Sequence, residues 1–195
     1  MNTSQHLTVI SLIGPSGGGK STAIKTLSAD HEVLQERYME LNCHQLDNRL
    51  LLSKWAYIQY WFDGVHKARA NGQNLLLTDR CPLDTCAYVL EGRSALLDIL
   101  KIAINELETL SIRVRTILIT ADFGVLQTRI NRRLADEPRR HEYNEADISH
   151  NRRAFDFYSE NTQQWDRLIN STQKTESELL LLLKTTIMDL TRLNK

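Results

Sequence analysis

Cysteine is scarce in this chain of 195 residues, and neither sign of charge is in excess. The three cysteines, Cys43, Cys81 and Cys86, include no C-x-x-C pair and predict reduced thiols in a cytoplasmic protein. The 24 lysines and arginines are balanced by 24 acidic residues, which gives no support to a broad surface for nucleic acid or an anionic membrane. Neither class of partner is therefore expected.

Long hydrophobic runs are also missing. The N-terminal segment lacks the basic region of a signal peptide, and the apolar stretch of residues 7–13 is too short to span a membrane. The chain contains no repeat, low-complexity tract or linker. We therefore expect residues 1–195 to form one α/β domain with a substantial core.

A glycine-rich segment, G-P-S-G-G-G-K-S at residues 14–21, fits the phosphate-loop pattern G-x-x-x-x-G-K-S/T. An apolar, β-branched stretch precedes it and a helix-compatible stretch follows, as that pattern requires. Glycines let backbone N–H groups surround an anion, and the helix N-terminus adds partial positive charge. Lys20 is expected to reach the β- and γ-phosphates of ATP, and Ser21 to bind Mg²⁺. The alternative is a glycine-rich turn with an incidental lysine. The predicted ATP-binding residues are Gly14, Ser16, Gly17, Gly18, Gly19, Lys20, Ser21 and Thr22.

Strand and helix patterns alternate along the whole chain. This alternation predicts a three-layer P-loop NTPase fold, with a five-stranded parallel sheet and helices on both faces. Ligands of such sheets bind at the carboxyl ends of the strands. The expected strands are 7–13, 32–40 (weakly), 75–78, 114–120 and 167–170, and the expected helices are 21–27, 46–70, 82–110 with a break near Gly92, 122–134, 145–164 and 179–193.

The helix expected at 46–70 carries two apolar rows. Leu51, Trp55, Ile58, Phe62 and Val65 form one stripe at helical spacing, which assigns Trp55 to the core. Tyr57 and Trp61 form a second row, so more than one side of this helix should be covered.

Asp79 and Arg80 follow directly after the apolar strand 75–78. P-loop proteins place a carboxylate near Mg²⁺ at such a strand end, and an arginine fork suits a phosphate or carboxylate. The alternative is a helix-capping aspartate beside a surface arginine.

Residues 71–88 resemble the segment of thymidylate kinases that carries the pattern D-R-Y-x-x-S-x-x-A-Y. Asp79, Arg80, Ala87 and Tyr88 stand at matching places, and residues 117–158 are also similar to that family. Four features depart from the pattern: Cys81 replaces its tyrosine, Asp84 replaces its serine, Val89 follows Ala-Tyr, and the Arg-Glu-Pro-Gly-Gly segment is missing. The resemblance implies a nucleotide kinase in which Arg80 and Tyr88 bind the acceptor. In the similar deoxynucleoside kinases a helix glutamine holds the base, which implies that role for Gln59.

Arg129, Arg132 and Arg133 share one helical face, and Arg139 and Arg140 follow in a charged loop at 135–143. Phosphoryl transfer spreads negative charge over the moving group, so a lid of about residues 133–144 that carries arginines suits it. Arg132, Arg133 and Arg139 are the predicted catalytic arginines, beside Lys20 and Asp79. In the alternative, they pair with Asp136 and Glu137 on a solvated loop.

These observations predict ATP-dependent phosphoryl transfer to a nucleoside monophosphate. The six histidines form no ligand set, so Mg²⁺ is expected to arrive with ATP, held by Ser21 and Asp79. Asp79 could instead be the general base of a deoxynucleoside kinase. Two further alternatives stay open, a kinase of another small metabolite and a regulatory ATPase that binds nucleotide. The expected partners are ATP and its acceptor, with a possible homodimer.

Overall fold

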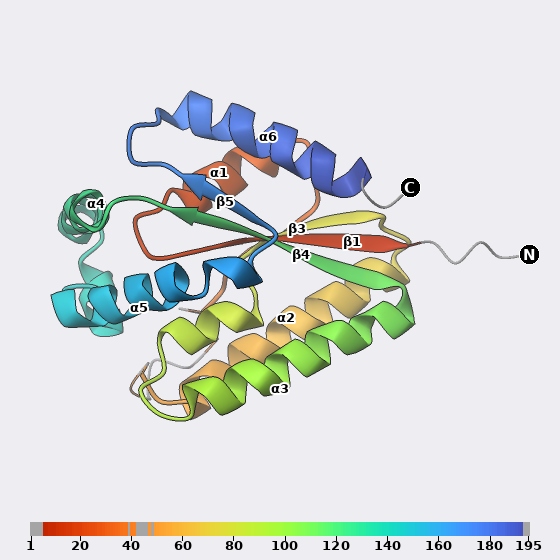
Figure 1. Cartoon of the computed structure of the whole chain (residues 1–195), viewed down its shortest axis with the longest axis horizontal. Coiled ribbons are helices and arrows are strands. Elements are labelled where there is room, and N and C mark those ends of the chain that lie inside the picture. The colour runs from red at the N-terminus through yellow and green to blue at the C-terminus, as the bar shows by residue number, and fades with distance from the viewer. Residues whose placement is uncertain (1–5, 39, 42–46, 48, 193–195) are drawn as a thin grey trace, which may run out of the picture.

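The computed structural model describes residues 6–38, 40–41, 47 and 49–192. It contains a five-stranded sheet in the order β2-β3-β1-β4-β5, in which every neighbouring pair is parallel. Figure 1 shows helices on both faces of this sheet, as the sequence predicts. The strands are β1 (Leu7–Ile13), β2 (Val33–Leu34), β3 (Leu75–Asp79), β4 (Ile112–Thr120) and β5 (Arg167–Asn170). The α-helices are α1 (Lys20–Leu27), α2 (Leu52–Ala70), α3 (Arg93–Glu106), α4 (Phe123–Asp136), α5 (Ile148–Glu160) and α6 (Glu176–Arg192).

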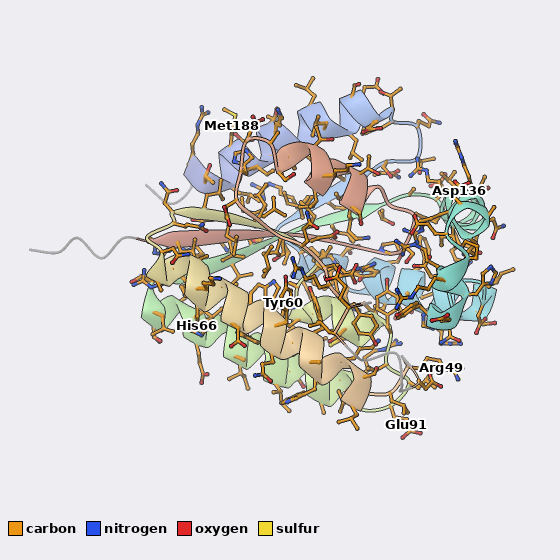
Figure 2. All side chains as sticks on the ribbon, turned by 180° about the vertical axis from the view of Figure 1, so that it is seen from behind. Arg49, Tyr60, His66, Glu91, Asp136 and Met188 are labelled. Atoms are coloured by element: carbon orange, nitrogen blue, oxygen red, sulfur yellow. The ribbon has the colours of Figure 1, made fainter. Side chains whose placement is uncertain are left out.

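Alternate residues of the central strands face two separate cores. On β1, Val9 and Ile13 pack with α2, α3 and α5, whereas Ile10 and Leu12 pack with α1 and α6. All four side chains are fully buried, as expected for parallel strands covered on both faces. Figure 2 shows His66 on α2 and Met188 on α6 at opposite outer sides of the molecule. The sheet therefore forms the middle of three layers, and its carboxyl edge is left for the loops.

Local sequence signals account for several boundaries. Gly92 adopts φ 70° and divides the expected helix 82–110 into a 3₁₀ helix, Pro82–Ala87, and α3. The start of α6 is a capping box in which the Thr175 N–H donates to Glu178 and the Glu178 N–H donates to the Thr175 hydroxyl. Asp122 precedes α4 at the N-cap position, but its side chain makes no capping hydrogen bond.

The buried face of α2 differs from the expected stripe. Trp55 is 55% exposed, so its assignment to the core is wrong, and Leu51 is exposed as well. Ile58 and Val65 of the expected stripe are buried as predicted, and they share the buried face with Tyr57 and Trp61 of the second row. Tyr57 and Trp61 can be buried because their polar atoms have hydrogen-bond partners on β3. The Trp61 indole donates to Thr78 Oγ1 at 3.3 Å, and the Tyr57 hydroxyl donates to the carbonyl of Asp79 at 3.4 Å.

Two other segments are more compact or shorter than expected. Strand β2 keeps only two residues of the expected 32–40. The expected loop 135–143 begins as the last turn of α4 and continues as a 3₁₀ helix, Pro138–Tyr143. Pro138 presets the backbone at its start, and Tyr143 is 92% buried at its end. No helix among the described residues has the length and apolar content needed to cross a membrane.

Candidate active site

The glycine loop between β1 and α1 is shaped by contacts that leave no room for side chains. Gly14 has φ 135°, and a Cβ atom built there would lie 2.2 Å from the carbonyl oxygen of Ile119 on β4. Gly17 and Gly19 also have positive φ values, of 80° and 99°. Residues 16–22 of the loop and α1 line a cavity of about 950 Å³. The structure thus brings the predicted phosphate-binding segment to the cavity at the carboxyl edge of the sheet.

Lys20 is 96% buried at the start of α1. Its Nζ donates hydrogen bonds of 2.8 Å to the carbonyl oxygens of both Gly14 and Pro15. Burial and the nearby charge of Arg80 lower the pKa of Lys20 to about 7, while Asp79 opposes that change. The ammonium group is held by loop carbonyls in a position from which it faces the cavity.

Ser21 and Asp79 meet across the gap between α1 and β3. The Ser21 hydroxyl donates to Asp79 Oδ2 at 3.0 Å. The other oxygen, Oδ1, is buried and is among the polar atoms without a hydrogen-bond partner in the described part of the chain. Burial raises the pKa of Asp79, with a further contribution from the carboxylate of Glu36. A hydroxyl beside a carboxylate oxygen with no partner is a donor set that suits Mg²⁺.

Arg80 leaves β3 with φ 70°, a conformation that non-glycine residues rarely adopt. Its Nε forms an ion pair with Glu36 Oε1 at 2.9 Å. Its Nη1 donates to the Gly14 carbonyl at 3.1 Å, to Asp84 Oδ1 at 3.2 Å and to the Tyr88 hydroxyl at 3.3 Å. Arg80 and Tyr88, both predicted to bind the acceptor, therefore share one hydrogen-bonded cluster that lines the cavity.

The lid arginines divide into two groups. Arg133 and Arg140 both pair with Glu145, and the Ser16 hydroxyl of the glycine loop donates to the same carboxylate at 3.5 Å. Arg132 is exposed but lines the cavity. Arg139 is exposed and lies outside the cavity lining, because the 3₁₀ helix turns the neighbouring Arg140 inward instead. The structure thus does not bring Arg139 to the cavity lining, and its catalytic role stays a prediction.

Arg129 connects the glycine loop to the segment that follows β5. Its guanidinium donates to the Gly17 carbonyl at 3.2 Å, and to the hydroxyl and carbonyl of Ser171 at 3.0 and 2.9 Å. The Ser171 hydroxyl in turn donates to the Gly18 carbonyl at 3.1 Å. The loop that follows β5 is thus fastened to the glycine loop.

The far end of the cavity is lined by side chains that the sequence interpretation did not select: Tyr38, Lys54, Tyr143, His150 and Asn151. Burial and the charges of Arg153 and Lys54 lower the pKa of His150 to about 4, so its imidazole is neutral. A lysine on the buried row of α2 is the signal that would have identified Lys54. Gln59 is exposed on the other side of α2 and is not part of the lining, so the structure does not bring it to the cavity, and its contact with the acceptor stays a prediction.

The cysteines add no reactive group to the described site. Cys81 and Cys86 are buried free thiols in the core that covers β1, and burial raises the pKa of both. Both therefore pack as small apolar residues, whereas Cys43 lies outside the described residues.

Comparisons with known proteins identify the family and the fold of the chain. Residues 9–154 match the model of the AAA domain family, and because the match covers well over half of the chain, the protein belongs to that family. A search of curated protein sequences found no match.

Solved structures give the fold a second reference. Deoxyadenosine kinase from M. mycoides with bound dATP aligns with a TM-score of 0.60 at 16% identity, covering 93% of this chain and 99% of that one. The same enzyme with dCTP gives 0.52 at 15% identity, with the same shares covered. YorR from Bacillus subtilis, in complex with phosphorylated GDP, gives 0.57 at 14% identity, covering 92% and 95%. The chain therefore has the P-loop fold seen in nucleoside and nucleotide kinases, and the comparisons do not single out thymidylate kinase.

Proposed function

We propose that this protein is an ATP-dependent kinase that transfers the γ-phosphoryl group to a nucleoside-type acceptor. One observation carries the proposal: the lysine, serine and aspartate of a phosphate site and the Arg80–Glu36 pair open into a single cavity of about 950 Å³. A donor and an acceptor can lie in such a cavity with their reacting atoms close together.

On the donor side, Lys20 and the loop N–H groups would bind the β- and γ-phosphates, and Ser21 and Asp79 would hold Mg²⁺. The metal supplies charge neutralisation for the phosphates when it is bound. Arg132, Arg133 and Arg140 line the side from which the lid can approach the transferring group. Their charge is most useful where negative charge grows during transfer.

On the acceptor side, we assign the role of general base to Glu36. Asp79 Oδ2 already accepts from Ser21, which places that carboxylate on the metal side. The Glu36 side chain is 31% exposed toward the cavity and keeps its carboxylate beside Arg80. In the proposed step, an acceptor hydroxyl gives its proton to Glu36, its oxygen bonds to the γ-phosphorus, and the bond from that phosphorus to ADP breaks.

This placement favours a nucleoside hydroxyl over the monophosphate expected from the sequence. An anionic acceptor needs no base and would be repelled by Glu36 and Asp84, which flank Arg80. A thymidylate-type acceptor remains the alternative, supported by the matching positions of Asp79, Arg80 and Tyr88.

The test is a phosphate-transfer screen over common nucleosides and their monophosphates with Mg·ATP. With a nucleoside acceptor, Glu36→Gln should lower kcat by roughly 10²–10⁴-fold. The matched control is Glu32→Gln, because Glu32 is exposed and lies outside the cavity lining. Transfer to monophosphates alone, with Glu36→Gln nearly unaffected, would establish the thymidylate-type alternative. ATP hydrolysis that outruns transfer to every acceptor would instead indicate a regulatory ATPase.

A further inference from the structure

Asp84 is on the 3₁₀ helix Pro82–Ala87, beside the cavity, and only 2% of it is exposed. Its Oδ2 accepts the backbone N–H of Cys81 at 3.0 Å. Its Oδ1 accepts the N–H of Gly14 at 3.2 Å, Nη1 of Arg80 at 3.2 Å and the hydroxyl of Tyr158. Both carboxylate oxygens are therefore engaged by protein donors, so Asp84 is unsuited to be a base or a metal ligand.

The bond to Cys81 only closes a local turn, which a neutral polar side chain could also do. In contrast, the single atom Oδ1 accepts hydrogen bonds from both the glycine loop and Arg80, and so joins the two. The carbonyl of Gly14 completes the arrangement, since it accepts from both Lys20 Nζ at 2.8 Å and Arg80 Nη1 at 3.1 Å. The donor-side lysine and the acceptor-side arginine are thus positioned against the same glycine, and Asp84 holds that glycine by its N–H.

A negative charge is required at this place because two cations converge on one carbonyl. Burial and Arg80 lower the pKa of Lys20, and the charges of Asp79, Asp84 and Glu36 counteract this. Asp79 and Glu36 have other contacts to make, with Ser21 and with the cavity. Of these three acids, Asp84 accepts a hydrogen bond from the backbone of the glycine loop, at the N–H of Gly14.

We propose that Asp84 is a positioning residue that fixes Arg80 and the glycine loop as one unit, so that donor and acceptor are held in register for transfer. The inference rests on the proposed kinase function and adds a residue to it. It also gives a reason for the aspartate that stands where the pattern of residues 79–88 would have serine: the acid replaces a group with no charge, next to a buried arginine.

Asp84→Asn and Asp84→Ser test the proposal, with Asp98→Asn as the matched control because Asp98 is exposed on α3. Serine is included because asparagine can place an amide donor opposite the Cys81 N–H. Rates are measured per folded molecule, with folding checked by circular dichroism. We expect kcat to fall about 10- to 100-fold in both Asp84 variants, as for loss of partners that orient reacting groups, and the Asp98 variant to stay within about twofold.

The double variant Arg80→Ala/Asp84→Asn decides how Asp84 acts. If Asp84 works through Arg80, the double variant is no slower than Arg80→Ala alone. Losses that multiply would show that Asp84 acts independently of Arg80, whereas normal kcat in the folded Asp84 variants, or failure of both to fold, would leave Asp84 as a stability residue. Each of these outcomes would overturn the proposal. A wild-type protein that phosphorylates no acceptor would refute the proposed function and this inference together. An active wild type in which the kcat losses of the Arg80 and Asp84 variants multiply would refute only the role of Asp84 and leave the proposed function standing.

Discussion

Gly14→Ala should be the most damaging conservative substitution in the glycine loop. The added Cβ atom would lie 2.2 Å from the Ile119 carbonyl oxygen, whereas ordinary contact begins at 3.4 Å, so the two atoms must separate by about 1.2 Å. Ile119 cannot move easily, because it is fully buried on β4 and paired with Ile169 of β5. The φ of 135° adds strain for any residue with a Cβ.

The two contributions give the expected magnitude. An unfavourable φ costs about 1–3 kcal/mol, and overpacking adds about 1–3 kcal/mol. A midpoint of about 4 kcal/mol corresponds to a fall in Tm of roughly 8–16 °C for a chain of this size. A marginally stable protein would lose much of its stability, since the whole free energy of unfolding is about 5–15 kcal/mol.

Two other glycines provide matched controls for thermal and urea unfolding. Gly92 has φ 70° but nothing within 4 Å of a built Cβ, so alanine there should cost only about 1–2 kcal/mol. Gly124 also has open space and lies within α4, so alanine there should stabilise by about 0.5–1 kcal/mol. If Gly14→Ala unfolds at the same temperature as Gly92→Ala, the close approach of the loop to β4 does not exist.

Three further predictions concern charges in the cavity. Lys20→Ala should lower turnover by about 10²–10³-fold with an unchanged circular dichroism spectrum, and near-normal turnover would refute the phosphate-binding role. Arg133→Ala should lower kcat more than it weakens ATP binding in calorimetry, because the negative charge that Arg133 meets grows in the transition state. Glu145→Gln should tighten ATP binding roughly threefold to tenfold, because it removes a carboxylate that competes with ATP for Arg133. For His150, the folded pKa of about 4 lies below its ordinary value, so between these two values the unfolded chain binds more protons than the folded one. The free energy of unfolding should therefore fall as the pH drops from about 6.5 to 4. Urea unfolding of His150→Gln should show a flatter pH dependence than the wild type, and an equal slope would contradict this.

Features that depend on residues adjacent in the sequence could be predicted from the sequence. The glycine loop, the strand that precedes it and the carboxylate at the end of β3 are each specified within a short segment. Alternation of strands and helices then sufficed for the parallel sheet, because the connections between parallel strands follow few rules. Asp79 and Ser21 meet for the same reason: Asp79 ends β3, and Ser21 lies in the first turn of α1, which follows the glycine loop at the carboxyl end of the neighbouring strand β1.

Features that depend on packing could not be predicted in this way. Both rows of α2 are apolar, so the choice of its buried face, and with it the exposure of Trp55 and Gln59, is made by partners on β3. Glu36 follows a two-residue strand that gives almost no periodic signal. Glu145 is one acid among many in a charged segment, and only the fold brings it to Arg133 and Arg140.

The bonds between Ser171 and the glycine loop have a consequence for biosynthesis. The hydroxyl of Ser171 and the carbonyl of Gly18 that it contacts are 153 residues apart in the chain, and Arg129 bonds to both segments. The glycine loop leaves the ribosome early, but it cannot acquire its final support until β5 and the following turn have been made. A nascent chain that stops before residue 167 would lack this brace. The ability to hold nucleotide firmly would thus arise late in synthesis, although its signature stands near the start of the chain.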